Sequence, residues 1–231
     1  MQRTYQYCDG EVCRDGLAWA LLSGDIQLHW GANHGCTTIG DDFTVTKAAH
    51  NRIYEIDGIP VIEFLRDYMI QGDEHSTNHA FLNIAIGFRA PEDIVHAMPD
   101  YDFLITHLVL NSENPAKRFI TVLPELPEGT KIWLVHRDPD IMSARLKELG
   151  AHLATALEGR APAAVLQFDC AGRGKVTFRE HQIAQQQTEL QQTLGAPAAW
   201  AGFYTYGEIA PIGKFNCFHN YTATLVAISE H

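Results

Sequence analysis

The sequence predicts an α+β fold in which largely antiparallel β-sheets pack with about three helices. Segments with strand patterns outnumber those with helical spacing by about two to one, and short turns join neighbouring strands. The chain has 231 residues, of which 46% are apolar, enough to build a hydrophobic core.

The N-terminal part begins with a predicted β-hairpin. Residues 16–23 are apolar, Gly24 and Asp25 follow as a turn, and residues 26–30 alternate in polarity. The Gly-, Asn- and Thr-rich residues 31–40 predict a loop, and residues 43–48 a further strand.

In the middle of the chain, Pro60 stands at the first turn of a predicted helix over residues 61–70. Short apolar runs predict four strands, at residues 80–88, 102–111, 118–123 and 131–136.

The last third repeats this organisation. Asp138 and Pro139 open a predicted helix that runs to about residue 157, and Gly195 ends another over residues 180–194. Strands are predicted at residues 164–169, 203–208 and 222–228.

Charge and hydropathy exclude several classes of function. Acidic residues outnumber basic ones by 28 to 17, so a broad basic surface for nucleic acid is missing. No apolar run is long enough to cross a membrane. We therefore expect a soluble, cytoplasmic protein without nucleic acid or membrane partners. The odd number of scattered cysteines indicates free thiols, and no second pair completes a metal site with Cys8 and Cys13.

Three polar, glycine-rich stretches stand out. They are Phe168-Asp169-Cys170-Ala171-Gly172-Arg173-Gly174, Gly202-Phe203-Tyr204-Thr205-Tyr206-Gly207-Glu208-Ile209 and His219-Asn220-Tyr221-Thr222. In order and spacing they resemble the C-terminal FIST domain. The segment 31–48 looks like the tail of an N-terminal FIST domain, so we expect such a tail over residues 1–50 and a C-terminal FIST-like domain over 51–231. A full N-terminal domain is longer, which indicates a truncated form or a shortened member.

This resemblance implies a bacterial intracellular sensory domain rather than an enzyme. It implies binding of a small ligand, such as an amino acid or another small anion, and signalling to a histidine kinase, a chemoreceptor or a cyclic-dinucleotide enzyme. Some members of the family look like haem-dependent nitric oxide sensors, so haem is a possible cofactor.

The candidate ligand site centres on Arg173. Glycines at 172 and 174 permit positive φ angles, so backbone N–H groups could converge on an anion beside the planar guanidinium. Gly174 and Arg173 are therefore predicted ligand-binding residues. The alternative is that Arg173 pairs with Glu208 or Glu180 and ties the turn to a neighbouring strand.

Four further residues join this candidate site. Glu208 could accept a ligand amine or hold Arg173, and Tyr204 could form a wall. Asn220 and Thr222 offer amide and hydroxyl groups. The alternatives are core or surface packing for Tyr204 and side-chain bonds that close a turn for Asn220 and Thr222.

Cysteine and histidine chemistry is the remaining possibility. Cys170 lies in the same motif and is included as a ligand contact. Alternatively, Cys170 is a nucleophile with His181 or His219 as its base. Cysteine is more commonly a small buried residue at the end of a strand, which is the third interpretation. His219 is the first choice for an iron ligand if haem binds. His75 and His79 are spaced as possible ligands, and His107 reads as a core residue. A protein-interaction module, in which these motifs stabilise the fold, stays open as another function.

Overall fold

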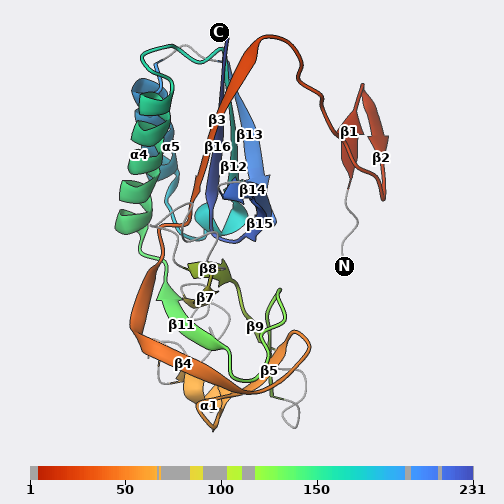
Figure 1. Ribbon diagram of the computed structural model, residues 1–231, viewed down its shortest axis with the longest axis vertical. Coiled ribbons are helices and arrows are strands. Elements are labelled where there is room, and N and C mark those ends of the chain that lie inside the picture. Colours follow the sequence, from red (N-terminus) through yellow and green to blue (C-terminus); the bar gives the residue numbers. More distant parts are fainter. Residues whose placement is uncertain are drawn as a thin grey trace.

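The protein is described from a computed structural model that covers residues 5–66, 68, 84–90, 103–110, 118–195, 199–212 and 215–230. Two sheets follow one another along the long axis of the molecule, and β3 runs from the upper sheet into β4 of the lower one (Figure 1). A small hairpin at the N-terminus stands to one side.

The upper sheet has four strands in the order β13-β12-β16-β3. Their bounds are Ala199–Thr205 for β13, Ala164–Cys170 for β12, Ala223–Glu230 for β16 and Ile26–Asn33 for β3. Among the strand pairs of the described residues, only β12 and β13 run parallel. The helix that leads from β12 to β13 makes this parallel pairing possible.

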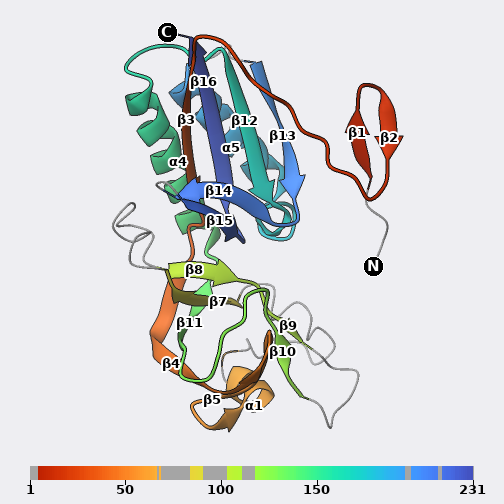
Figure 2. The ribbon, with the colours of Figure 1, turned by 45° about the vertical axis from the view of Figure 1, so that its right-hand side comes forward.

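Two helices cover one face of the upper sheet, α4 (Pro139–Ala156) and α5 (Glu180–Thr193) (Figure 2). The Asp138 side chain caps α4 by accepting hydrogen bonds from the backbone N–H groups of Asp140 and Ile141. Leucines from both helices then pack on alternate residues of the strands. This core comprises Leu146, Leu149, Leu153, Leu157, Val165, Leu190, Leu194, Ala223, Leu225 and Ala227.

The lower sheet runs β8-β7-β11-β4-β5-β10-β9, with β6 paired to β5, and is antiparallel throughout its described pairs. Its strands are Phe103–Thr106 (β8), Ile84–Arg89 (β7), Lys131–His136 (β11), Thr37–Ala49 (β4), Arg52–Ile56 (β5), Ile120–Thr121 (β10), Val109–Leu110 (β9) and Ile59–Pro60 (β6). Helix α1 (Val61–Arg66) packs its buried Val61, Phe64 and Leu65 into this second core.

Two hairpins complete the fold. Strands β14 (Glu208–Ile212) and β15 (Phe215–His219) pair with each other, and this hairpin lies on the face of the upper sheet opposite the helices (Figure 2). Strands β1 (Gln6–Cys8) and β2 (Glu11–Cys13) form the N-terminal hairpin.

The α+β class with largely antiparallel sheets is confirmed, and the described residues contain the three predicted α-helices. The predicted helix over 61–70 is described as far as Arg66. The predicted pair His75 and His79 lies outside the described residues.

Two expectations about the N-terminal part were wrong. Residues 16–23 form no strand and are exposed, so the hairpin with residues 26–30 does not form; β3 pairs with β16 instead. The predicted loop over residues 31–40 is mostly strand, because β3 extends to Asn33 and β4 begins at Thr37. Long-range pairing with β16 and β11 outweighs the local loop composition.

Candidate functional site

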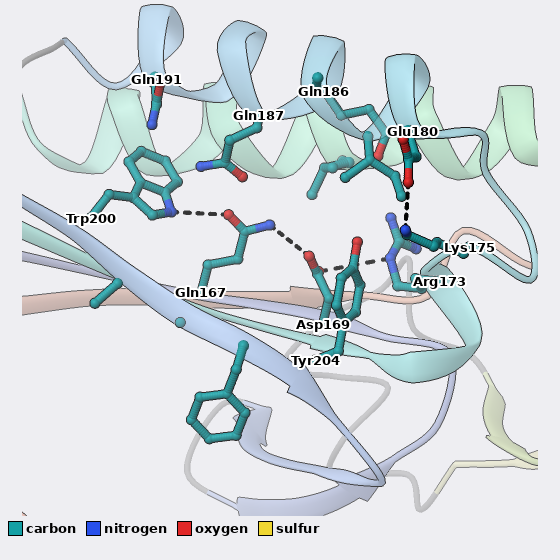
Figure 3. Close-up of a pocket in the computed structure, with 16 residues that line it drawn as sticks. Gln167, Asp169, Arg173, Lys175, Glu180, Gln186, Gln187, Gln191, Trp200 and Tyr204 are labelled. Carbon is teal, nitrogen blue, oxygen red and sulfur yellow. Dashed lines mark hydrogen bonds and ion pairs between the residues drawn. The ribbon is translucent and has the colours of Figure 1, made fainter.

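A cavity of about 740 Å³ lies between helix α5 and strands β12 and β13 (Figure 3). We call it the α5 pocket. Its floor is formed by Gln167 and Asp169 of β12, which share one face of the strand by the two-residue period. On β13, Trp200 and Tyr204 occupy the same face, and Tyr204 lies directly across from Asp169 in the parallel register.

Gly202 allows β12 and β13 to approach each other beneath this pocket. A Cβ atom at this position would lie 1.7 Å from the carbonyl oxygen of Gln167. Only a glycine fits such a backbone approach. The second glycine-rich stretch thus has a structural role at the pocket floor.

A hydrogen-bond relay crosses the floor. The indole Nε1 of Trp200 donates to Oε1 of Gln167 at 3.0 Å, and Nε2 of Gln167 donates to Oδ2 of Asp169 at 2.7 Å (Figure 3). Because the indole can only donate, the relay fixes which way the Gln167 amide points. Every donor in the relay is therefore directed toward the Asp169 carboxylate.

Asp169 retains unused acceptor capacity at the end of this relay. Its Oδ1 is buried and accepts no hydrogen bond from the described residues. The nearest cationic atom, Nε of Arg173, is 3.9 Å away, which is an ion pair but too long for a hydrogen bond. Burial raises the pKa of Asp169, and the charge of Arg173 and the Gln167 amide partly oppose this.

Arg173 follows β12 in the short 3-10 turn η2 (Ala171–Arg173), and its side chain is buried. Its Nη1 donates to the carbonyls of His34 (3.1 Å) and Tyr221 (3.5 Å). Its Nη2 donates to the carbonyl of Met142 at 3.5 Å. The guanidinium therefore ties the turn to the end of β3, to α4 and to the segment before β16.

This geometry corrects the expected pairing of Arg173. Its acidic partner is Asp169, whereas Glu180 pairs with Lys175 at the mouth of the pocket and Glu208 lies in another cluster.

The positive φ angles expected in this turn were wrong. Neither Gly172 nor Gly174 has a positive φ angle. The N–H of Gly174 donates within the turn, to the carbonyl of Ala171. Gly172 is needed for space, since a Cβ atom there would lie 2.5 Å from the Tyr221 ring.

The roof of the α5 pocket carries glutamine side chains. In Figure 3, Gln187 and Gln191 extend from α5 toward the floor. Gln186 also lines the pocket, but its amide donates to Oγ of Ser143 on α4 at 2.8 Å. The amides of Gln187 and Gln191 are therefore the roof groups that could contact a bound ligand.

Cys170 and Glu208 belong to a separate buried cluster on the other side of β12. Glu208 begins strand β14 rather than ending the aromatic strand, and its carboxylate accepts a hydrogen bond from the Thr205 hydroxyl. Burial raises the pKa of Glu208, opposed by hydrogen bonds from Thr205 and Cys170. Burial also raises the pKa of the Cys170 thiol, and the neighbouring Glu208 adds to this effect.

Asn220 and Thr222 stabilise the turn before β16. The hydroxyl of Thr222 donates to the carbonyl of Asn220 at 3.0 Å, and Nδ2 of Asn220 donates to the carbonyl of Ile105 in β8 at 3.2 Å. Asn220 thus links the upper and lower sheets. Both side chains are buried.

His219, the residue predicted to bind iron if haem is present, contacts the backbone of β14. Its side chain is buried, and its Nε2 lies 3.0 Å from the carbonyl of Ala210, to which it donates. Burial lowers the pKa of the ring. Within the described ranges, no three His, Cys, Asp or Glu side chains come together as a metal site.

The structure therefore divides the predicted site residues into two groups. Arg173 and Tyr204 line the α5 pocket, and Gly174 lies beside Tyr204. The others, Cys170, Glu208, Asn220, Thr222 and His219, are buried away from it. Ligand binding by any of them stays a prediction.

Sequence reasoning missed the floor and roof residues, of which Asp169, Gln167, Trp200 and Gln187 are the main ones. One signal could have found them: two polar residues at alternate positions of a strand that otherwise faces a leucine core.

Models of two protein families match the chain. The FIST N domain matches residues 1–59 and the FIST C domain matches residues 62–211. The chain belongs to the FIST family. FIST domains are sensory domains for small ligands in signalling proteins, and the family is generally non-enzymatic.

Relatives of this FIST chain occur in mycobacteria. An uncharacterized protein of Mycobacterium tuberculosis is 27% identical over 225 residues, which cover 96% of this chain and 56% of that protein. An uncharacterized protein of Mycobacterium bovis is 29% identical over 224 residues, with 96% and 55% coverage. The chain thus spans little more than half the length of these relatives. No solved structure matches it. Among the described residues, no helix is long and apolar enough to cross a membrane.

Proposed function

We propose that this FIST chain senses a small molecule that binds in the α5 pocket. The observation that carries the proposal is the half-buried Asp169 carboxylate, which lines a cavity of about 740 Å³, is oriented by the Trp200–Gln167 relay and keeps one buried oxygen without a hydrogen bond from the described residues. A buried acceptor without a donor is costly, and a ligand that supplies a donor removes this cost. The cavity volume suits a metabolite-sized ligand.

The position of Arg173 supports a sensory role. Its Nε faces Asp169 at the pocket floor, while Nη1 and Nη2 hold the carbonyls of His34 and Met142. His34 lies between β3 of the upper sheet and β4 of the lower sheet. A ligand that draws Asp169 toward itself would therefore change the contact that connects the pocket to the joint between the sheets.

The proposed output is signalling inside the cytoplasm. Binding would be read by a histidine kinase, a chemoreceptor or a cyclic-dinucleotide enzyme. Hydrolytic or transfer chemistry at Cys170 is not part of the proposal, because burial and Glu208 both raise the pKa of that thiol.

A second candidate function is protein interaction through the upper sheet. The strand face opposite the helices exposes Phe203 and Trp30, and the β14–β15 hairpin exposes Ile209 and Phe218. Several exposed apolar side chains on one face of a sheet favour a role in protein contact.

Native mass spectrometry of the purified protein tests the sensory proposal. Ala184 lines the pocket from α5, whereas Thr188 is exposed on the same helix and is not part of the lining. We expect a retained small molecule in the wild type and in Thr188→Trp, and its loss in Ala184→Trp, whose indole fills the cavity. Equal retention in both variants would remove the α5 pocket as the site.

A further inference from the structure

The polar groups of the α5 pocket are arranged for a ligand that donates hydrogen bonds rather than for an anion. An anion needs a donor group, and the one buried cation among the lining residues is Arg173. Its Nη1 and Nη2 donate to three backbone carbonyls and its Nε faces Asp169, so the guanidinium is already engaged inside the protein rather than directed at an incoming carboxylate or phosphate. Lys175, at the mouth, is exposed and paired with Glu180.

Asp169 offers hydrogen-bond acceptors at the pocket floor, which suit a ligand that donates hydrogen bonds. Its Oδ2 is occupied by the Gln167 amide, and Oδ1 is the acceptor that remains. Trp200 holds Gln167 and Gln167 holds Asp169, so these two hydrogen bonds restrict rotation of the Asp169 carboxylate. A ligand that binds the Asp169 carboxylate must bring an N–H or O–H group.

We infer that the α5 pocket recognises a small organic amine, whose ammonium group contacts the Asp169 carboxylate. The aromatic rings of Trp200 and Tyr204 and the side chain of Ile183 provide an apolar wall for its body, and aromatic faces favour a neighbouring cation. The roof amides of Gln187 and Gln191 are placed for an acceptor at the other end of the molecule. The chain's net charge of −11 favours approach of a cation. This inference rests on the proposed sensory function of the same pocket.

Three probes of similar shape separate the alternatives at neutral pH: 2-phenylethylamine, 2-phenylethanol and 3-phenylpropanoate. Each is titrated into ¹⁵N-labelled protein, and the indole N–H signal of Trp200, assigned with Trp200→Phe, reports on the relay at the floor. We expect the amine to bind most tightly, the alcohol more weakly by about tenfold, and the carboxylate most weakly.

Two variants test which carboxylate of the pocket binds the ammonium group. Asp169→Asn is expected to weaken amine binding by about tenfold or more while changing alcohol binding little. Glu180→Gln is the matched control, because Glu180 lines the same pocket but is exposed and pairs with Lys175; amine binding should change less than about threefold. The order of the three probes on the wild type needs no variant and is decisive even if Asp169→Asn does not fold.

The outcomes separate the two proposals. Tighter binding of the carboxylate than of the amine, or equal amine affinity in Asp169→Asn, would overturn the amine inference and leave the sensory pocket standing. If no probe shifts the Trp200 signal and no molecule is retained in native mass spectrometry, the sensory function fails and the amine inference with it.

Discussion

The Nη1 atom of Arg173 lies 3.1 Å from the carbonyl oxygen of His34, at the point where the chain leaves one sheet for the other. This bond joins residues 139 positions apart in sequence. It places the arginine of the Gly-Arg-Gly turn between the pocket floor and the joint of the two sheets, so its first role is structural.

Removing the Arg173 side chain should destabilise the fold. Arg173→Met removes the guanidinium hydrogen bonds to the carbonyls of His34 and Met142 and leaves Asp169 without its cationic partner, and we expect the free energy of unfolding to fall by about 3 kcal/mol. Urea denaturation measures this. Lys175→Met removes an exposed cation two residues away and should leave the stability nearly unchanged. Equal stability of the two variants would contradict the role given to Arg173.

Acid should destabilise the protein through His34. Burial, and then the charge of Arg173, lower the pKa of His34 from 6.5 to about 3, and its Nδ1 accepts the backbone N–H of Cys36. The folded state keeps the ring neutral while the unfolded state takes up a proton, so this stability is complete above pH 6.5 and is lost as the pH falls toward about 3. Each pKa unit corresponds to about 1.4 kcal/mol, so the loss amounts to several kcal/mol.

Denaturation at a series of pH values measures the His34 effect. His34→Asn keeps an acceptor for the Cys36 N–H but does not titrate, so its unfolding free energy should change less over the same range. Asp169 and Glu208, whose pKa values are raised by burial, act in the opposite direction, because each adds stability as the pH falls. An equally steep acid loss in His34→Asn would show that other groups cause it.

The cysteines should divide by burial in their reaction with iodoacetamide. Cys8 and Cys13 are exposed on the N-terminal hairpin, whereas Cys36, Cys170 and Cys217 are buried. Burial raises the pKa of Cys36 to about 12 and also raises those of Cys170 and Cys217. Mass spectrometry after labelling of the native protein should find adducts on the two exposed thiols alone. Rapid labelling of Cys170 at neutral pH would reopen the nucleophile hypothesis.

A methyl group at position 202 should disrupt the pocket floor. Gly202→Ala places a Cβ atom against the Gln167 backbone, and we expect a loss of more than about 2 kcal/mol together with a shifted Trp200 indole signal. Ala201→Val is the control, since that neighbour on β13 is exposed and already carries a side chain. A Gly202→Ala variant as stable as Ala201→Val would rule out the close approach of the two strands.

Local signals predicted the elements with strong patterns and caps. Strand β11 matches the predicted range 131–136, and α4 begins at the predicted Asp138 cap because that side chain satisfies two N-terminal N–H groups. Residues 16–23 have an apolar strand pattern but acquire no pairing partner, and β3 extends farther than predicted because β16 pairs along its whole length.

The candidate site was predictable only in part, for a similar reason. The glycine-rich motifs drew attention to Arg173 and Tyr204, which do line the pocket. Asp169 stands in the first of these motifs and alternates with Gln167, but its role depends on partners that are distant in sequence, Trp200 and the glutamines of α5. These meet only when β12 and β13 pair beneath the helix.

A crystal structure of the protein with its retained or added amine tests the central claim most directly. We predict electron density for the molecule between α5 and the β12–β13 floor, with a donor nitrogen within hydrogen-bonding distance of the Asp169 carboxylate. A bound molecule in the cluster of Cys170 and Glu208, with the α5 pocket filled only by water, would contradict the account.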